Sequence, residues 1–577
     1  MKKILFYTFL ICFVRAYSQK QASNWYFGDF AGINFDTNTG TVTALTDGQL
    51  RTDEGCTSIS DDDGNLLFYT DGITVYNIDT AGNHQVMDNG DFLFGNPSST
   101  QSAIIIPKPD NPNIYYIFTQ GTTFTSQQDF GFRYSEVDMS LNGGLGAVTR
   151  MKNERLLYKA SEKLGAVLKD CESGNIYVVT LAASDAQTNP NAVDNNNTTF
   201  YVYEVSNTGV NLSGSYNTGR TINERRGYLK ISPDGTKLVA ANIRDGLLLY
   251  DFDVTDGSIA FNQQININST GLNGATFPYG IEFSSNSQVL YVSTYNDFSG
   301  NGDNNPSNHR SALLQYDVSL NNPADLNASQ TNVEIKQGYR SALQLGPDSK
   351  IYKTESSTYN NGLPNLSTIE LPNIVGTDCT YLPNTVSLNG RNGRQGLPPF
   401  IASYFSEKID ITSGAAESNN LSLCAGDTFT LIAESIPGAT YTWTLDGNPL
   451  PTPTPPNELF LNTGGNYTVF IEIPSNDCES KEGQAIVTFY DVPVANTALK
   501  LDACSDDLTT DFDLTVRDAD ILGTQDPSIY EVHYFESQLD AENNENEIMG
   551  LFTNTLNPTP IFARIHNKNN PNCYDTT

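Results

Sequence analysis

A short pattern of apolar runs separated by tight turns recurs along this chain and limits the folds open to it. The clearest copy, "YLKISPDGTKLVAANIRDGLLLYDFDVTDG" from Tyr228 to Gly257, holds three apolar runs divided by Pro-Asp-Gly and Arg-Asp-Gly. Such turns between alternating apolar runs predict a small antiparallel sheet. Similar copies start at Cys56, Ala103, Ala166, Ile281 and Ala342. A unit repeated at roughly fifty to sixty residues indicates a repeat architecture.

A small residue immediately precedes the first strand of each copy. These residues are Gly55, Ser102, Gly165, Gly227, Gly280 and Ser341, and a seventh, Gly396, precedes "LPPFIASYF". The third strand of each copy carries a large apolar residue before a polar one. The segment after Gly396 has no third strand, and the seventh instance of this pair is Phe35-Asp36 near the N-terminus. Residues 19–405 are therefore predicted to form an all-β, seven-bladed β-propeller of the WD40/YVTN type, closed by both termini. The alternative is an eight-bladed or open arrangement, because the spacings vary.

The remaining segments divide into a leader and two further modules. Residues 1–18 contain two lysines, then a short apolar core, and end in small residues. This pattern predicts a cleaved signal peptide. Residues 406–422 are polar and rich in small residues, as linkers are. Residues 423–492 alternate with period two around Trp443 and predict an Ig-like or PKD-like β-sandwich. Residues 493–577 predict a second Ig-like sandwich, expected to stop short of its last strand.

Charge and cysteine usage indicate an exported protein. The formal net charge is −34 and becomes more negative once the leader's basic residues are removed, so nucleic acid is not an expected partner. After cleavage no segment is apolar enough to span a membrane. The cysteines form no C-x-x-C pair, which speaks against a zinc ribbon or a thioredoxin-like site. We expect one disulfide in each tail module, Cys424–Cys478 and Cys504–Cys573.

Longer motifs carry a family resemblance. "NWYFG", "EGC.SISD..GNLLFYTDGITVYN", "GYLKISPDGTKL", "ALQLGPDSKIY" and "GLPPFIASYF" resemble the N-terminal propeller of large surface proteins that the type IX secretion system exports in gliding Gram-negative bacteria. "CSDD…FDLT…ILGTQDPSIYEVHYFESQLDAE…CYDTT" resembles a module of the same proteins that precedes a gliding-motility-associated, type B sorting domain. The resemblance implies a location at the cell surface. No sorting domain is visible in the sequence, so we expect a chain truncated at its C-terminal end.

The segments ahead of the small residues are basic, although the propeller as a whole is acidic. The five positions before each small residue hold eight basic residues: Arg51, Lys163, Arg225, Arg226, Lys336, Arg340, Arg391 and Arg394. The acids there are Asp53, Glu54, Glu162 and Glu224. In a propeller these segments surround one mouth of the central channel, where we predict a positive potential.

We predict that this mouth binds an anionic or hydroxyl-rich ligand through arginine forks. The proposed contact residues are Arg51, Glu54, Gln101, Lys163, Arg226, Tyr279, Arg340 and Arg394. The alternative is that the arginines pair with acids of neighbouring blades and only hold the ring together.

Signatures of catalysis and of cofactors are weak. The sequence contains no G-x-S-x-G elbow, no H-E-x-x-H and no P-loop, and its four histidines are scattered over three domains. "DFSGNGDNN" could hold Ca²⁺ through Asp297, Asn301 and Asp303, although the closing Glu of a calcium loop is missing. No other cofactor is expected.

These features favour a secreted, non-catalytic adhesion or binding protein of the Gram-negative cell surface. Its expected partners are an extracellular polysaccharide or a surface protein, besides the export machinery. The alternative is a hydrolase or lactonase in which carboxylates such as Glu54, Glu162 and Glu224, with or without Ca²⁺, act in the channel.

Overall fold

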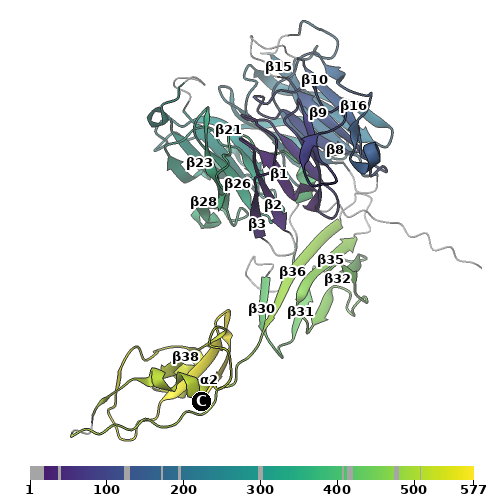
Figure 1. Ribbon diagram of the computed structural model, residues 1–577. Coiled ribbons are helices and arrows are strands. Elements are labelled where there is room, and N and C mark those ends of the chain that lie inside the picture. The colour runs from purple at the N-terminus through teal and green to yellow at the C-terminus, as the bar shows by residue number, and fades with distance from the viewer. Residues whose placement is uncertain are drawn as a thin grey trace, which may run out of the picture. The chain divides into compact units, whose positions relative to one another are not determined.

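The protein is described from a computed structural model (Figure 1). It describes residues 19–36, 41–121, 130–169, 173–192, 196–296, 303–405, 409–411, 420–433, 435–472, 480–506 and 509–577. The chain divides into two compact units, Met1–Glu407 and Lys408–Thr577. Among the described residues no helix is both long enough and apolar enough to cross a bilayer.

The first unit contains seven consecutive antiparallel sheets, as the repeat predicted. The first three blades are β1 (Asn24–Phe27), β2 (Ala31–Asp36) and β3 (Thr41–Leu45); β4 (Thr57–Ser60), β5 (Leu66–Thr70), β6 (Val75–Ile78) and β7 (His84–Val86); and β8 (Ala103–Pro107), β9 (Ile114–Gln120), β10 (Phe132–Asp138), β11 (Ala147–Val148) and β12 (Glu154–Leu157). The fourth and fifth are β13 (Leu164–Leu168), β14 (Ile176–Ala182), β15 (Asn197–Ser206) and β16 (Gly209–Ile222); and β17 (Leu229–Ile231), β18 (Lys237–Asn242), β19 (Gly246–Asp253) and β20 (Ser258–Ile265).

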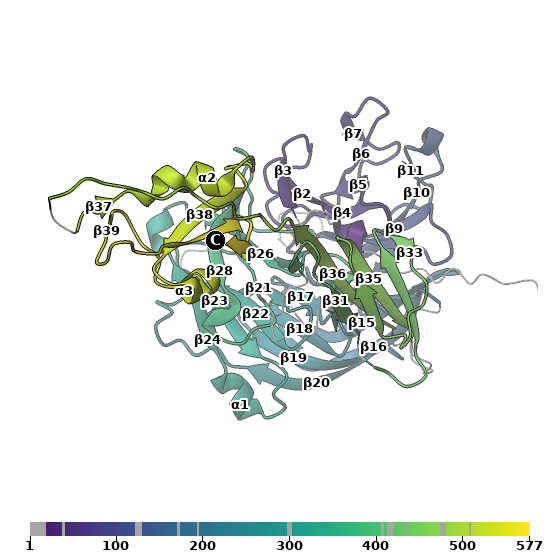
Figure 2. The same ribbon diagram turned by 90° about the horizontal axis from the view of Figure 1, so that it is seen from below.

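The last two blades are built in the same way. They are β21 (Phe277–Phe283), β22 (Val289–Tyr295), β23 (Ser311–Asp317) and β24 (Thr331–Lys336); and β25 (Leu343–Leu345), β26 (Ile351–Thr358), β27 (Asn361–Ile369) and β28 (Tyr381–Ser387). The short helix α1 (Pro323–Ala328) precedes β24. Figure 2 shows β17 to β20 following one another from the middle of the wheel outward.

The blades form a closed ring. Each inner strand from β4 to β25 contacts the inner strand of the next blade. The seventh blade meets the first, because β28 contacts β3 and the ring of Trp25 lies 5.5 Å from that of Tyr352. The predicted seven-bladed propeller is confirmed.

At Gly280 and Gly396, the small residue ahead of the inner strand is explained by close backbone approach at the channel mouth. A Cβ on Gly396 would lie 1.5 Å from the carbonyl oxygen of Glu54, and one on Gly280 would lie 2.2 Å from that of Ser341. Each of these contacts joins the entrances of two neighbouring blades. A larger side chain would force the blades apart.

Closure of the ring differs from prediction in one respect. The two ends of the unit meet, since Phe400 packs 5.9 Å from Trp25, but residues 397–401 add no fourth strand to the first sheet. Pro398 and Pro399 have no N–H to donate to a ladder, which explains why this segment does not pair. It continues instead into the channel, where Ile401 forms a parallel bridge with Ala166 of β13.

The second unit begins with a β-sandwich. One sheet contains β29 (Ile409–Asp410), β30 (Asn420–Cys424), β32 (Thr440–Leu445), β33 (Asn448–Pro449), β35 (Gly465–Glu472) and β36 (Ser480–Tyr490), and the other contains β31 (Phe429–Ile432) and β34 (Glu458–Leu461). Trp443, fully buried, lies in their shared core. The predicted boundary at residue 423 is too late, because β29 and β30 pair in parallel with β36 and belong to the sandwich. Much of the predicted linker, residues 406–408 and 412–419, lies outside the described residues.

The last module is not the predicted sandwich. It has a three-stranded sheet in the order β38 (Tyr530–Phe535), β40 (Phe562–Asn567) and β41 (Asn570–Thr576), and a small pair, β37 (Asp511–Phe512) and β39 (Phe552–Thr553). Two short helices, α2 (Asp518–Leu522) and α3 (Gln538–Asn543), accompany the sheet. The α3 sequence is rich in helix formers, and its start is capped by Ser537, whose side chain accepts from the Asp540 N–H.

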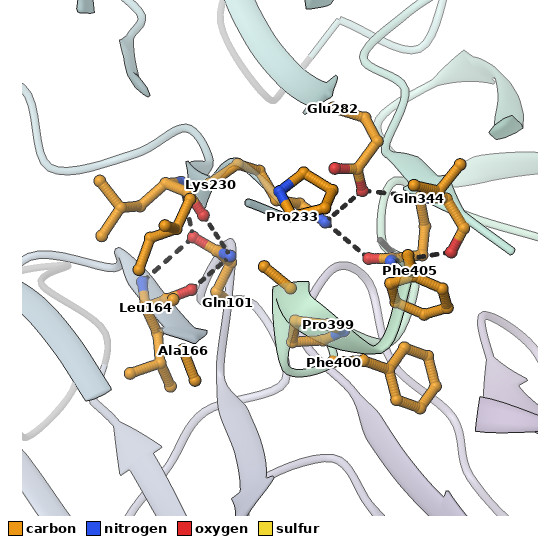
Figure 3. A pocket seen from close by; sticks show the side chains of 15 residues that line it. Gln101, Leu164, Ala166, Lys230, Pro233, Glu282, Gln344, Pro399, Phe400 and Phe405 are labelled. Atoms are coloured by element: carbon orange, nitrogen blue, oxygen red, sulfur yellow. Dashed lines mark hydrogen bonds and ion pairs between the residues drawn. The ribbon is translucent and has the colours of Figure 1, made fainter. Parts of the chain in front are cut away.

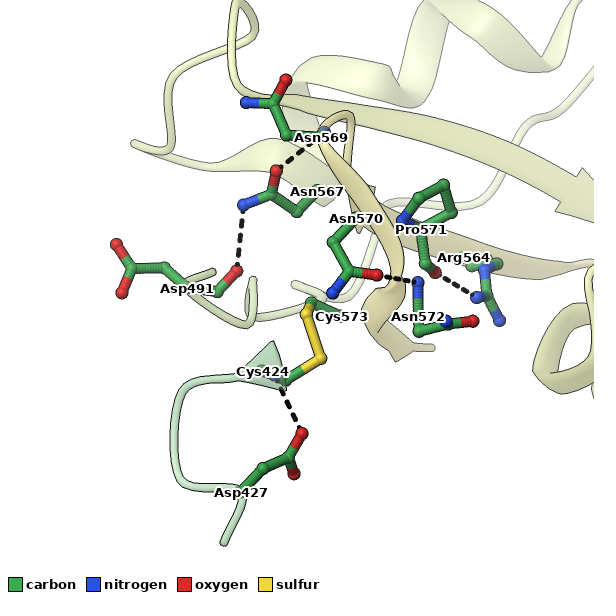
Figure 4. The surroundings of a disulfide bond; sticks show 10 residues. All are labelled: Cys424, Asp427, Asp491, Arg564, Asn567, Asn569, Asn570, Pro571, Asn572 and Cys573. Atoms are coloured by element: carbon green, nitrogen blue, oxygen red, sulfur yellow. Dashed lines mark hydrogen bonds between the residues drawn. A yellow bond between two sulfur atoms is a disulfide. The ribbon is translucent and has the colours of Figure 1, made fainter. Parts of the chain in front are cut away.

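A disulfide joins these two modules, and both predicted pairings are wrong. Cys424 at the end of β30 bonds to Cys573 in β41, 149 residues later (Figure 4). Beside it, the Asn567 amide donates to the Asp491 carbonyl across the same junction at 3.2 Å. Cys504 is free and exposed, and Cys478 lies outside the described residues. The prediction pairs cysteines within modules, whereas the end of β30 brings Cys424 to the neighbouring module.

Candidate functional site

The predicted mouth residues come together at one end of the channel, and Glu54 is buried among them. Its side chain is 3% exposed, and its Oε1 accepts hydrogen bonds from the Tyr279 hydroxyl at 2.9 Å and from Nη1 of Arg340 at 3.2 Å. The Arg340 guanidinium lies 4.8 to 5.3 Å from the ring centres of Tyr279, Tyr295 and Tyr339. Burial raises the pKa of Glu54 to about 7, against the opposing charge of Arg340.

Lys163 supports the backbone of the fifth blade. Its fully buried Nζ donates to the carbonyl oxygens of Arg226, Gly227 and Ala241 at 2.7, 2.9 and 2.9 Å. Desolvation lowers the pKa of Lys163 to about 7. The N–H groups of Lys163 Nζ therefore point into the protein and donate to backbone carbonyls there.

Gln101 connects three blades. From the entrance of the third blade, its Nε2 donates to the carbonyls of Leu164 and Leu229, and its Oε1 accepts from the backbone N–H of the same two residues. All four bonds are between 2.6 and 3.1 Å. The amide is therefore saturated by β13 and β17.

The outer arginines of the mouth are held by acids. Arg226 makes a two-pronged contact with Glu224, Nε to Oε1 at 2.8 Å and Nη2 to Oε2 at 2.9 Å. Burial alone would raise the pKa of Glu224, but its bonds with Arg226 outweigh this and lower the pKa to about 2. Arg394 likewise bonds to Asp29, at 2.9 Å, and to Asp53.

The remaining basic residues of the rim also have partners within the protein. Arg51, whose side chain is 68% exposed, pairs with Asp29; Lys336 pairs with Glu334 and Glu355; and Arg391 donates to the Thr46 carbonyl. Arg225 also has an interaction partner. The Arg51–Asp29 and Lys336–Glu355 pairs join neighbouring blades, as in the alternative prediction, whereas Arg226 and Glu224 belong to one segment.

The channel is narrow below the mouth as well (Figure 3). Phe400, Ala402 and Phe405 of the C-terminal segment lie against the inner strands, and the remaining cavity is about 20 Å³, room for one water molecule. Across from them, Nζ of Lys230 bonds to Glu282 Oε2 and to Gln344 Oε1, both at 2.6 Å. A sugar or a lactone does not fit this space.

Only one of the three predicted calcium ligands, Asp303, belongs to the described residues. Asp297 and Asn301 lie outside the described residues. Asp303 is described, and its carboxylate accepts from the backbone N–H of Asn305 and the side-chain amide of Asn308, both at 2.8 Å. Within the described residues Asp303 therefore acts in turn formation.

Sequence reasoning missed an exposed aromatic residue on the same face. Phe92 lies in the loop from β7 to β8, which opens on the side of the blades where Glu54 and Arg340 lie. Its side chain is 77% exposed and its φ is 60°, a left-handed conformation that bulky residues rarely adopt. Asn153 holds the loop: its Nδ2 donates to the Phe92 carbonyl and its Oδ1 accepts from the Phe94 N–H, both at 2.9 Å.

Further apolar residues lie in the same loop and in the segments next to it. Phe94 stacks on Phe130 at 4.2 Å, with the Arg133 guanidinium 5.1 Å from the Phe94 ring. Met151, 40% exposed, comes two residues before Asn153. We call Phe92, Phe94, Phe130, Met151 and Arg133 the aromatic shelf. The signal in the sequence was a pair of phenylalanines in a turn-rich segment, "DNGDFLFGN".

Comparisons with known proteins bear on the last module and on the propeller. Residues 500–577 match the family described as the Flavobacterium inter-domain disulphide bond domain. In this chain the Cys424–Cys573 bond joins that region to the preceding sandwich. A stable disulfide is typical of proteins outside the cytoplasm. No curated protein sequence matches the chain.

Several solved structures are similar to this chain over 63–65% of its length, with low TM-scores. A 6-phosphogluconolactonase candidate from Bacteroides fragilis is 11% identical with a TM-score of 0.39, covering 65% of this chain and 97% of its own. A second, from Bacteroides uniformis, is 12% identical with a TM-score of 0.39, covering 63% and 98%. TolB from Acinetobacter baumannii is 12% identical with a TM-score of 0.28, covering 65% and 81%.

Proposed function

We propose that this chain is a secreted, non-catalytic binding protein of the bacterial cell surface, exported by a type IX route, whose propeller holds an extracellular polysaccharide. The N-terminal leader pattern, the inter-module disulfide and the match of residues 500–577 support an exported protein. The small cavity beside Phe400 and the paired acids and bases of the mouth support a binding site outside the channel.

The aromatic shelf carries the proposal. An exposed phenylalanine held in a strained conformation by two hydrogen bonds costs stability, and such strain is retained mainly at functional sites. A flat aromatic ring offers the apolar C–H face of a sugar a stacking surface, while polar groups around it can bind hydroxyls.

A polysaccharide fits this surface better than a protein does. The strongly exposed apolar groups of the shelf are Phe92 and Met151. A stable protein interface buries about 800 Å² on each partner around a larger apolar core. One ring and one thioether are enough for a single sugar unit.

The test is a glycan array probed with the mature chain, followed by titration calorimetry with the best ligand. Phe92→Ala should weaken binding at least about tenfold, as loss of an anchoring aromatic does. Phe261→Ala, an aromatic that is 40% exposed on β20, is the matched control and should leave the affinity unchanged.

Three other results would overturn the proposal. Glycan binding that is insensitive to Phe92→Ala would remove the shelf from the site. Binding lost with Arg51→Ala instead would return the site to the mouth. Capture of a surface protein, with no glycan bound, would replace the ligand class.

A further inference from the structure

Two histidines and a glutamate of the last module share one face of its sheet. Glu531 and His533 are two residues apart on β38, so their side chains point to the same side. His566 on β40 lies directly opposite Glu531 in the register of the two strands. The neighbouring positions Tyr534 and Ile565 point the other way, into the hydrophobic core.

The three side chains are already at the separations of ligands around one ion. Oε1 of Glu531 lies 2.9 Å from Nε2 of His566 and 3.5 Å from Nε2 of His533, and all three ligand atoms lie within 4.8 Å of one another. Ligands about 2.05 Å from a tetrahedral zinc ion lie about 3.3 Å apart. The imidazole rings stack with their centres 4.8 Å apart and their planes 9° apart, so binding one ion through both Nε2 atoms requires side-chain rotations.

A second carboxylate prepares His533 for this role. Oε1 of Glu547 lies 2.6 Å from Nδ1 of His533, which places the ring proton on Nδ1 and the lone pair on Nε2. Nε2 of His533 makes no hydrogen bond within the described residues. A carboxylate behind a metal-binding histidine is a recurrent second layer of zinc sites.

Access and charge also suit a cation. Glu531 is 44% exposed, so solvent reaches the cluster, while His566 is nearly buried. With neutral imidazoles, Glu531 and Glu547 leave two negative charges, which a divalent ion balances. Arg564 shares this face, but its guanidinium donates to the carbonyls of residues 541, 542 and 571.

We propose that Glu531, His533 and His566 bind a divalent transition-metal ion, with Zn²⁺ as the best match. Glu547 is a positioning residue. Two imidazoles and one carboxylate favour zinc over Ca²⁺ and Mg²⁺, which prefer oxygen ligands only. Three protein ligands leave the fourth position open to water or to a group on a partner.

Titration calorimetry of the untagged mature chain with zinc sulfate tests the site. We expect one equivalent bound at a micromolar Kd or tighter, unaffected by millimolar Ca²⁺. His533→Ala and His566→Ala should each weaken binding about 100-fold or more, and Glu547→Gln about 10- to 100-fold. Glu545→Gln, an exposed acid of the same loop, is the control and should bind as the wild type does.

Absorption spectroscopy of the Co²⁺ form provides a second measurement, independent of calorimetry. The Co²⁺ form should show the strong visible absorption of tetrahedral coordination, and His533→Ala should abolish it. Circular dichroism and mapping of Cys424–Cys573 would show that each variant folds. Zinc binding that persists in the His533→Ala/His566→Ala double variant, or that is absent from the wild type, would overturn the proposal.

Discussion

Arg340 donates a hydrogen bond to Glu54 at 3.2 Å, across 286 residues of sequence. The bond links the entrance of the seventh blade to that of the second, and both partners are buried. Three tyrosine rings surround the guanidinium. A residue pair that looked like part of a binding site therefore holds the ring of blades together.

At pH 8, where Glu54 is ionised, Arg340→Ala should destabilise the propeller by about 3–5 kcal/mol, because it leaves a buried carboxylate without its partner and removes a cation packed on aromatic rings. Chemical unfolding followed by tryptophan fluorescence in a Trp443→Phe background reports on the propeller alone, since Trp25 is then the single tryptophan. Arg51→Ala, exposed on the same rim, should change stability by less than about 0.5 kcal/mol. Equal effects of the two variants would contradict this reading.

Stability should fall as pH rises from about 4.5 to 7, through Glu54. The unfolded chain releases this proton near the ordinary pKa of 4.5, whereas the folded chain holds it to about pH 7. Folded Glu54 thus binds the extra proton in that window, and about 3 kcal/mol of stability is lost across it. Glu54→Gln cannot titrate, so the stability difference from the wild type should change by that amount between pH 4.5 and 8. A constant difference would show that Glu54 is ionised throughout.

Phe400→Ala should open a cavity beside Trp25 and cost about 3 kcal/mol, since Phe400 is 7% exposed and packs on Trp25 and Phe405. In the Trp443→Phe background the emission of Trp25 should shift to the red as water enters. Unchanged emission together with unchanged stability would mean that the segment does not fill the channel.

When the unreduced protein is cut with trypsin and a glutamate-specific protease, which separates Cys424 from Cys478, the peptides should contain Cys424 linked to Cys573. Closing a loop of 149 residues stabilises the folded tail by roughly 5 kcal/mol in the chain-entropy account. Cys424→Ser/Cys573→Ser should lower the free energy of unfolding of the tail by up to that amount and leave the propeller transition in place. Recovery of a Cys424–Cys478 peptide would refute the pairing.

Phe92→Gly should stabilise the propeller, or leave it unchanged, despite removing a large side chain. Glycine adopts a φ of 60° without strain, and Phe92 has little buried surface to lose. The expected gain is up to about 1 kcal/mol, measured by thermal unfolding. Asn153→Ala removes two hydrogen bonds from the loop and should be destabilising instead.

The sequence predicted the propeller because its signals are local and repeated. Turn residues, alternation and a small residue such as Gly396 recur in every blade, and each follows from backbone geometry within a few residues. The positions of Glu54, Gln101 and Arg340 at one mouth were also predictable, since each stands at a fixed place ahead of an inner strand. Helix signals at Ser537 were present but were outweighed by the expectation of a second sandwich.

What the sequence by itself determined, then, is the wheel and the group of residues at its mouth. Tertiary structure decided the rest: which acid takes up each arginine's charge, where residues 397–405 run, that Cys424 reaches Cys573, and that His566 stands opposite Glu531. Propensity and turn chemistry act over a few residues, whereas an ion pair, a disulfide or a ligand set depends on distances between segments brought together only by packing.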